Sequence, residues 1–145
     1  MRCRQLQRSD LPVLVSMSRE NMAAVILASW GKEWKDEKLL ELLLDQRVTT
    51  MVLEDEGEIV AYYCIEEIDE YLFISSFQVS KGKQGQGVGQ HMLELIEVDG
   101  REGGKVGVEL CVQATNEKAK EFYYYHGYDL MYPNGNNMVM RKKLV

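Results

Sequence analysis

A glycine-rich segment is the part of the chain whose residue types and spacing point most directly to chemistry. Residues 82–89 are Gly-Lys-Gln-Gly-Gln-Gly-Val-Gly. They lie between a strand-like run over 71–79, rich in β-branched and aromatic residues, and a segment over 88–98 with helical spacing of apolar residues. Glycines allow positive φ and close approach of the backbone to a ligand. Because the first N–H groups of a helix are free and lie at the positive end of its dipole, this turn predicts a phosphate-binding site.

Two common nucleotide-binding motifs fail in this segment at the residue that carries their mechanism. A P-loop requires Lys followed by Ser or Thr directly after its last glycine, but Val88 and Gly89 follow Gly87. A dinucleotide fingerprint requires Gly-x-Gly-x-x-Gly, and Gln90 stands in place of its third glycine. The segment therefore predicts a phosphate-bearing ligand of another kind.

A second segment with functional potential covers residues 114–128, Ala-Thr-Asn-Glu-Lys-Ala-Lys-Glu-Phe-Tyr-Tyr-Tyr-His-Gly-Tyr. Thr115 or Asn116 is suited to cap a helix, and Gly127 is suited to end it. Asn116 and Tyr123 are seven residues apart, so they share a helix face and are separated by roughly 10.5 Å. One face of this helix could therefore present an amide and a phenol to the same elongated ligand.

Both segments resemble the signatures of the GNAT superfamily of N-acetyltransferases, which binds acetyl-CoA. Residues 84–89 resemble its pyrophosphate loop, Gln/Arg-x-x-Gly-x-Gly/Ala. Residues 116–128 resemble its segment Asn-x-x-Ala-x-x-Phe/Leu-Tyr-x-x-x-Gly-Phe/Tyr, with every element present. The resemblance implies that acetyl-CoA binds here and that the whole chain has the GNAT architecture.

The resemblance also assigns roles to individual residues. It implies that Asn116 contacts the pantetheine arm and that Tyr123, beside the thioester sulfur, is the general acid. It implies that the N–H of Phe77 or Val79, on a strand that splays from its neighbour, polarises the thioester carbonyl. The residues expected to hold acetyl-CoA are Phe77, Gln78, Val79, Gln84, Gly85, Gln86, Gly87, Val88, Gly89, Gln90, Asn116 and Tyr123.

The general base of the transfer is not evident in the sequence. GNAT families place a glutamate at one of two strand positions, and these hold Phe73 and Cys111 here. A free cysteine in a strand is usually a small core residue. Glu66, Glu67 and Glu70 could act through a water, although each is more simply a solvated carboxylate at a strand end. An acceptor with a low amine pKa would need no strong base.

The acceptor site is expected between the first two helices, where GNAT proteins usually shape it. Trp30 and Trp34 lie there with acidic neighbours, and could form an apolar cleft with an acidic rim for an ammonium group. Alternatively, both tryptophans could pack the helix pair on the sheet. The candidate acceptor-binding residues are Trp30, Trp34, Glu37 and Glu70.

Composition limits the class of protein. The chain has 145 residues, 46% of them hydrophobic, and a net charge of −6, so we expect one domain over residues 1–145 and no binding to nucleic acid or to an anionic membrane. The three cysteines and two histidines form no disulfide or metal pattern, and no metal is expected. We recognise no signal peptide and no run long enough to span a bilayer, and we expect a cytoplasmic protein.

The expected elements follow the order β-α-α-β-β-β-α-β-α-β-β. Together with the resemblance, this order predicts an α/β domain with a GNAT-like mixed, mostly antiparallel central sheet and helices on both faces. Strands are expected over residues 2–7, 48–54, 58–66, 70–79, 106–112, 127–132 and 138–144. Helices are expected over about 10–29, from residue 36 onward, over 88–98 and over 116–126.

The predicted function is transfer of an acetyl group from acetyl-CoA to a primary amine, on a small molecule or a peptide, by direct attack on the thioester. The alternative is a non-catalytic acyl-CoA-binding or sensing module on the same fold. The missing base favours the alternative, whereas the intact Tyr123 opposes it. The sequence does not name the acceptor, and it leaves open whether the chain forms a homodimer.

Overall fold

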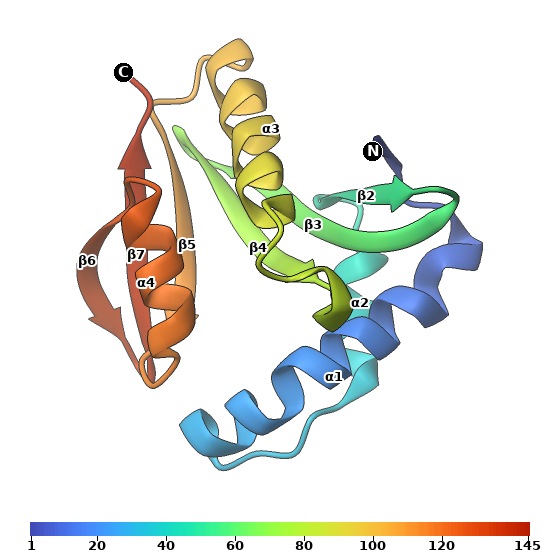
Figure 1. Cartoon of the computed structure of the whole chain (residues 1–145). Helices are drawn as coiled ribbons and strands as arrows, with labels where there is room; N and C mark the ends of the chain where they lie inside the picture. Colours follow the sequence, from blue (N-terminus) through green and yellow to red (C-terminus); the bar gives the residue numbers. More distant parts are fainter.

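A seven-stranded sheet forms the centre of the computed structural model, which describes residues 1–145 (Figure 1). The strands lie in the order β1-β2-β3-β4-β5-β7-β6, and only β4 and β5 are parallel neighbours. The predicted mixed, mostly antiparallel sheet is therefore confirmed. The strands are β1 (Arg2–Gln5), β2 (Thr49–Asp55), β3 (Glu58–Ile68), β4 (Tyr71–Val79), β5 (Gly107–Gln113), β6 (Asp129–Asn134) and β7 (Asn137–Lys143).

Helices cover both faces of the sheet, as predicted. The first two pack on one face against β2 and β3, and the last two pack on the other face against β3, β4 and β5. The helices are α1 (Leu11–Trp30), α2 (Asp36–Leu43), α3 (Val88–Glu102) and α4 (Glu117–Tyr125), with short 3₁₀ helices η1 (Arg8–Asp10) and η2 (Lys81–Lys83).

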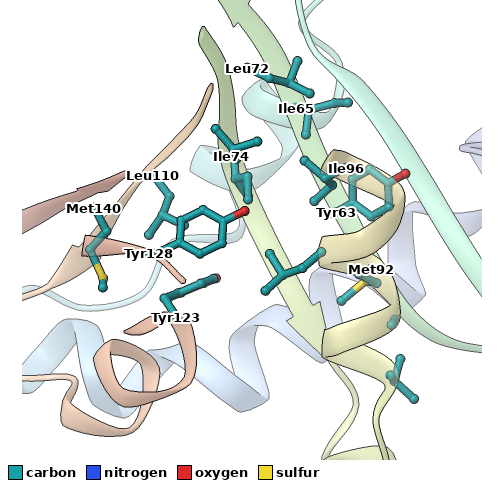
Figure 2. Close-up of a cluster of buried hydrophobic side chains, with 14 of the residues drawn as sticks. Tyr63, Ile65, Leu72, Ile74, Met92, Ile96, Leu110, Tyr123, Tyr128 and Met140 are labelled. Atoms are coloured by element: carbon teal, nitrogen blue, oxygen red, sulfur yellow. The ribbon is translucent and has the colours of Figure 1, made fainter. Parts of the chain in front are cut away.

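Strand β3 takes part in both cores because its side chains alternate between the two faces of the sheet. Tyr63 and Ile65 lie in the larger cluster beneath α3 and α4, which Figure 2 shows with Met92 and Ile96 of α3. Tyr62 lies in the smaller cluster beneath α1 and α2. Each fully buried aliphatic side chain stabilises the fold by about 1.5–3 kcal/mol, so the two clusters hold all four α-helices on one sheet.

The sheet opens between its two parallel strands. β4 and β5 pair only from Tyr71 opposite Gly107 to Ile74 opposite Leu110. Directly after this, Ser75 has no partner on β3, because the register shifts there. Such a bulge bends its strand and increases the local twist. From Ser75 onward β4 leaves β5, and Figure 1 shows the two strands diverging.

Two hairpin turns set the strand boundaries. Glu56 and Gly57 both have positive φ, at 52° and 79°, as a two-residue type I′ turn requires, and they lie between the strands predicted over 48–54 and 58–66. The last turn is shorter than the gap left between the strands predicted over 127–132 and 138–144, because Asn134 already pairs with Asn137. β6 continues through Pro133, which an edge strand tolerates because its free side needs no N–H donor.

One expectation about membranes differs from the structure. By length and composition alone, the helical stretch Arg8–Trp30 is long and apolar enough to cross a bilayer, with a hydropathy of 1.3, whereas we expected no such run. The stretch buries Leu14, Met17 and Ser18 against the sheet.

Candidate functional site

A cavity of about 600 Å³ borders the open edge of β4. It brings together the two segments that the sequence singled out, the glycine-rich loop before α3 and the face of α4. Residues of α1 complete it, although no sequence motif predicted their part. The lining residues are Asn21, Met22, Val25, Phe77, Gln78, Val79, Lys81, Lys83, Gln84, Gly85, Gly89, Asn116, Lys118, Ala119, Phe122 and Tyr123.

The glycine-rich loop presents a row of free hydrogen-bond donors. The main-chain N–H groups of residues 84–90 donate to no acceptor in the protein, and the first bond of the helix runs from the His91 N–H to the Gly87 oxygen at 3.1 Å. Gly85 and Gly87 have φ of 74° and 86°, a region that favours glycine. Consecutive free N–H groups at a helix N-terminus suit the oxygens of a phosphate group.

The side chains of the loop shape it rather than extend its row of donors. Gln84 donates from Nε2 to the Val79 oxygen at 3.0 Å, and Gln86 donates to the Gly82 oxygen at 3.1 Å. Val88 is buried in the larger core, and the exposed Gln90 donates to Glu94 at 3.3 Å. In these four residues, the main-chain N–H groups are therefore available to a ligand, whereas the side chains are used within the protein.

Packing also explains why residue 89 is a glycine, a reason that the sequence motif did not reveal. A Cβ at this position would lie 3.0 Å from Cζ of Phe122, closer than an ordinary van der Waals contact. The missing side chain therefore makes room for the Phe122 ring, which packs against Phe77 with centroids 6.0 Å apart.

The cavity is positively charged although the chain is acidic. Lys81, Lys83 and Lys118 line it, and no aspartate or glutamate does. Lys118 also lies 3.4 Å from Oε1 of Gln84. The three ammonium groups beside the free N–H row favour an anionic ligand at this end of the cavity.

The open edge of β4 offers main-chain groups along the cavity. The Ser80 N–H donates to Val60 on β3 at 2.9 Å. Since bonding alternates along an antiparallel pair, the N–H groups of Phe77 and Val79 face away from β3. The Val79 oxygen accepts from Nδ2 of Asn21 at 2.8 Å. Oδ1 of Asn21 is buried without a partner, so it is an acceptor available to a ligand that carries an N–H.

Asn116 caps α4 and also lines the cavity. Its Oδ1 accepts from the Ala119 N–H at 3.2 Å, which satisfies one of the free donors at the start of the helix. Its Nδ2 has only a long contact, 3.4 Å, to Gln113. The oxygen is used by the fold, and the amide N–H₂ remains as a donor for a ligand.

Tyr123 lies where α4 meets β4, in a group of aromatic rings. Its ring lies 5.8 Å from those of Phe77 and Tyr128 and 5.2 Å from that of Phe122, and Figure 2 shows it beside Tyr128. The residue is 8% exposed, and its hydroxyl makes no hydrogen bond within the protein. Burial raises the pKa of Tyr123, so the phenol keeps its proton at neutral pH.

A second cavity of about 310 Å³ meets the first at Phe77, Gln78, Asn116 and Tyr123. Its walls are mainly apolar and come from α1, α2, β4, β5 and α4. Lys38 is the one charged residue in the lining. The apolar lining residues include Met22, Ile26, Trp30, Trp34, Leu39, Leu42, Ile74, Leu110 and Val112.

The structure brings two of the four candidate acceptor residues to this second cavity. Trp30 and Trp34 line it, and Trp34 also packs against the smaller core, while binding of an acceptor by either tryptophan stays a prediction. The exposed Glu37 lines neither cavity. Glu70 lies in the turn before β4, roughly 23 Å along the strand from Phe77. The predicted acidic rim is therefore absent.

The two positions expected for a base also fail to supply one. Cys111 lines the second cavity, but burial raises the pKa of its thiol, which stays protonated at neutral pH. Phe73 pairs with Glu109 of β5 and lines neither cavity. Ser75 of the lining donates to Glu66 at 3.5 Å, a long contact. No carboxylate lines either cavity, in agreement with the missing glutamates in the sequence.

Comparisons with known proteins agree with this arrangement. An uncharacterized N-acetyltransferase in the pepI 3′ region of Lactobacillus delbrueckii subsp. lactis is 29% identical in sequence, and the match covers 85% of this chain and 81% of that protein. The crystal structure of the PaiA N-acetyltransferase from Thermoplasma acidophilum in complex with coenzyme A has a TM-score of 0.84 at 18% identity, covering 98% of each chain.

A further solved structure, the ribosomal-protein-S18-alanine N-acetyltransferase from Escherichia coli, has a TM-score of 0.75 at 20% identity and covers 99% of this chain and 93% of that one. At such identities these structures show the shared fold. Residues 10–128 match the family described as Acetyltransferase (GNAT) family. Since this match spans most of the chain and includes both segments of the site, the chain belongs to the GNAT family of acetyltransferases.

Proposed function

We propose that the chain transfers the acetyl group of acetyl-CoA to a primary amine, which attacks the thioester directly. The observation that carries the proposal is the buried, unpartnered phenol of Tyr123 at the point where the two cavities meet. One cavity leads from this hydroxyl to the row of free N–H groups, and the other leads to an apolar pocket. The arrangement fits a donor with a phosphate at one end and an acceptor that approaches from the opposite side.

The residues of the larger cavity fit acetyl-CoA. The N–H groups of residues 84–90 would hold the diphosphate, and the lysines at the same end would offset its charge. The open edge of β4, Oδ1 of Asn21 and Nδ2 of Asn116 would hold the amides of the pantetheine arm. When bound, the cofactor supplies a thioester as the acetyl donor.

Three groups of this chain would then act on the transfer. The N–H of Phe77 or Val79 donates to the thioester carbonyl and stabilises the negative charge that develops there. The Tyr123 hydroxyl donates its proton to the sulfur as the C–S bond breaks. The amine nitrogen forms the new C–N bond and loses a proton, which returns through water to the Tyr123 oxygen and restores the phenol. Holding both reactants in adjoining cavities supplies much of the acceleration.

The alternative, a non-catalytic acyl-CoA-binding module, would need the same loop but no proton donor. Membership of an acetyltransferase family and the retained phenol both support the enzyme. Free thiol released from acetyl-CoA in the presence of a pool of amines distinguishes the two functions. We expect amine-dependent thiol release, and we expect pantetheine to bind much more weakly than CoA in calorimetry. Tight CoA binding without thiol release from any amine would instead identify a binding module.

A further inference from the structure

A chain of three hydroxyl groups follows the wall of the second cavity, with Ser76 and Ser18 in the lining and the buried Tyr62 between them. Ser76 of β4 lines the cavity, and its Oγ lies 3.0 Å from the Tyr62 hydroxyl. The Tyr62 hydroxyl also bonds to Oγ of Ser18 on α1, and Ser18 donates to the Leu14 oxygen at 2.8 Å. Tyr62 and Ser18 are fully or almost fully buried, and Ser18 also lines the second cavity.

The contact between Ser18 and the Leu14 oxygen decides which hydroxyl donates and which accepts at each of the other two hydrogen bonds. A carbonyl oxygen can only accept, so the single hydroxyl hydrogen of Ser18 is used on Leu14. Ser18 must therefore accept from Tyr62, and Tyr62 must accept from Ser76. Burial raises the pKa of Tyr62 to about 12, so Tyr62 keeps the proton that this order requires. Because Ser76 uses its hydroxyl hydrogen on Tyr62, its oxygen can only accept a hydrogen bond from a ligand in the cavity.

Ser76 is also close to the reaction centre. It precedes Phe77, whose main-chain N–H faces the open edge of β4, and consecutive Cα atoms are about 3.8 Å apart. An N–H group that donates to the Ser76 hydroxyl would therefore sit near the carbonyl that is attacked. The hydroxyl can hold one N–H of an amine and leave its lone pair free to react.

The charges around the second cavity disfavour a cationic acceptor. No carboxylate lines it, and its one charged residue, Lys38, has the same sign as an ammonium group. Two carboxylates bond to lining residues from outside the cavity: Asp36, which accepts from Trp34 and is paired with Arg19, and Glu66, which has a long contact of 3.5 Å with Ser75. Moving a charged amine into an apolar pocket without a counter-ion is costly. The pocket therefore accepts an amine in its neutral form, and a second cationic group on the same molecule would be repelled.

We propose that Ser76 binds the neutral amine of the acceptor, and that Tyr62 and Ser18 fix the orientation of the Ser76 hydroxyl. We propose further that the acceptor is the weakly basic α-amine of a residue that has an apolar side chain. The inference rests on the acetyl transfer proposed above and specifies its substrate class. The α-amine next to an amide has a pKa of about 7.7–8.0, against about 10.4 for a lysine side chain. At equal affinity for the neutral form, this difference alone favours the α-amine by roughly 10²-fold near neutral pH.

The first test compares acceptors with the unaltered protein. Leucinamide, a short peptide that begins with leucine, spermidine and Nα-acetyl-lysine amide are each supplied with acetyl-CoA, and thiol release gives kcat/KM. We expect the two α-amines to exceed the two strongly basic amines by about 10²-fold. Leucinamide acting as well as the peptide indicates a small-molecule acceptor, and a clear preference for the peptide indicates a protein N-terminus. Preference for spermidine or lysine overturns the inference but leaves acetyl transfer standing, whereas no release from any amine overturns both.

The second test examines the hydroxyl chain. Ser76→Ala and Tyr62→Phe are each expected to raise the KM of the α-amine about 3- to 10-fold. The KM of acetyl-CoA is expected to stay nearly unchanged, and the melting temperature to fall by a few degrees because each change removes a buried hydrogen bond. Thr50→Val is the matched control, because it removes a buried hydroxyl that contacts Cys64 and lies outside both cavities. An unchanged acceptor KM in Ser76→Ala, or an equal rise for both substrates, would overturn the role of Ser76.

Discussion

Three consecutive tyrosines in α4 differ sharply in their surroundings. Tyr123 is 8% exposed, whereas Tyr124 and Tyr125 are 67% and 84% exposed. Successive residues of a helix point about 100° apart, so only one of the three can face the cavity. The chain thus contains two internal controls for any test of the buried phenol.

Replacing Tyr123 by Phe isolates the role of its hydroxyl. The aromatic contacts with Phe77 and Tyr128 survive, so the melting temperature and the affinity for CoA are expected to change little. The chemical step is expected to slow by roughly 10²–10⁴-fold, because the departing sulfur loses its proton donor. Single-turnover rates measure this step. Equal loss in Tyr124→Phe or Tyr125→Phe would show that the proton comes from elsewhere.

Sequence motifs predicted some residues of the site but not others. Asn116 and Tyr123 could be predicted because they lie on one helix at fixed spacing, and the loop could be predicted because glycines mark it. Asn21 and Ser76 carry no such signal, since each joins the site through tertiary packing against another element. Glu70 was misplaced because residue type alone does not tell which end of a strand faces a cavity.

At the scale of elements, the loop before α3 depends on the left-handed conformation of Gly87. Its φ is 86°, and an added Cβ would touch no other residue. Any loss of function on substitution must therefore come from backbone strain or from the ligand itself. At Gly89, by contrast, a side chain would also press on the Phe122 ring, so Gly87 is the cleaner position to test.

Gly87→Val is expected to weaken CoA binding by about tenfold or more, because a β-branched residue disfavours positive φ and would turn the N–H row. Gly87→Asn is the matched variant, since asparagine tolerates this conformation better. Calorimetry with CoA measures both, and circular dichroism verifies the fold. Normal CoA affinity in a folded Gly87→Val variant would place the diphosphate outside this loop.

The boundaries of α3 show where local signals mislead. We expected this helix to end near residue 98, before a glycine-rich stretch, but it continues to Glu102. Gly100 lies inside the helix because a Cβ there would come within 2.7 Å of Leu144. The helix ends only where Gly104 adopts a φ of 70°. A glycine required by packing and a glycine that ends a helix look the same in the sequence.

At the scale of the whole molecule, charge is distributed unevenly. The chain carries a net charge of −6, yet three lysines and no carboxylate line the larger cavity, and of these lysines only Lys81 has a carboxylate nearby, Glu20 at 4.0 Å. We expect the Kd for CoA to rise several-fold between about 50 and 500 mM salt, because added ions screen these lysines. Titrations over this range measure the slope. A Lys83→Gln, Lys118→Gln double variant is expected to bind CoA more weakly and to lose most of the salt dependence of the Kd. If the Kd of this variant changed with salt as steeply as that of the unaltered protein, these lysines would not contact the ligand.

The overall order of elements could be predicted because each helix and strand has its own apolar period. The bulge at Ser75 could not, since nothing in the local sequence distinguishes that residue from its neighbours in the strand. The parallel pairing of β4 with β5 joins segments separated by the whole of α3. Such long-range pairing depends on the three-dimensional packing of the chain, and the GNAT resemblance was needed to expect it.

The short pairing between β4 and β5 also has a consequence for amide hydrogen exchange. Residues 1–79 and 107–143 form two contiguous stretches whose strands meet only from Tyr71 to Ile74 and from Gly107 to Leu110. Beyond these four paired positions, the amides of Phe77 and Val79 have no strand partner, so in the free protein their hydrogens are open to exchange with deuterium. A ligand that occupies the gap would protect these two amides, so their exchange in the free and bound protein reports directly on occupancy of the open edge of β4.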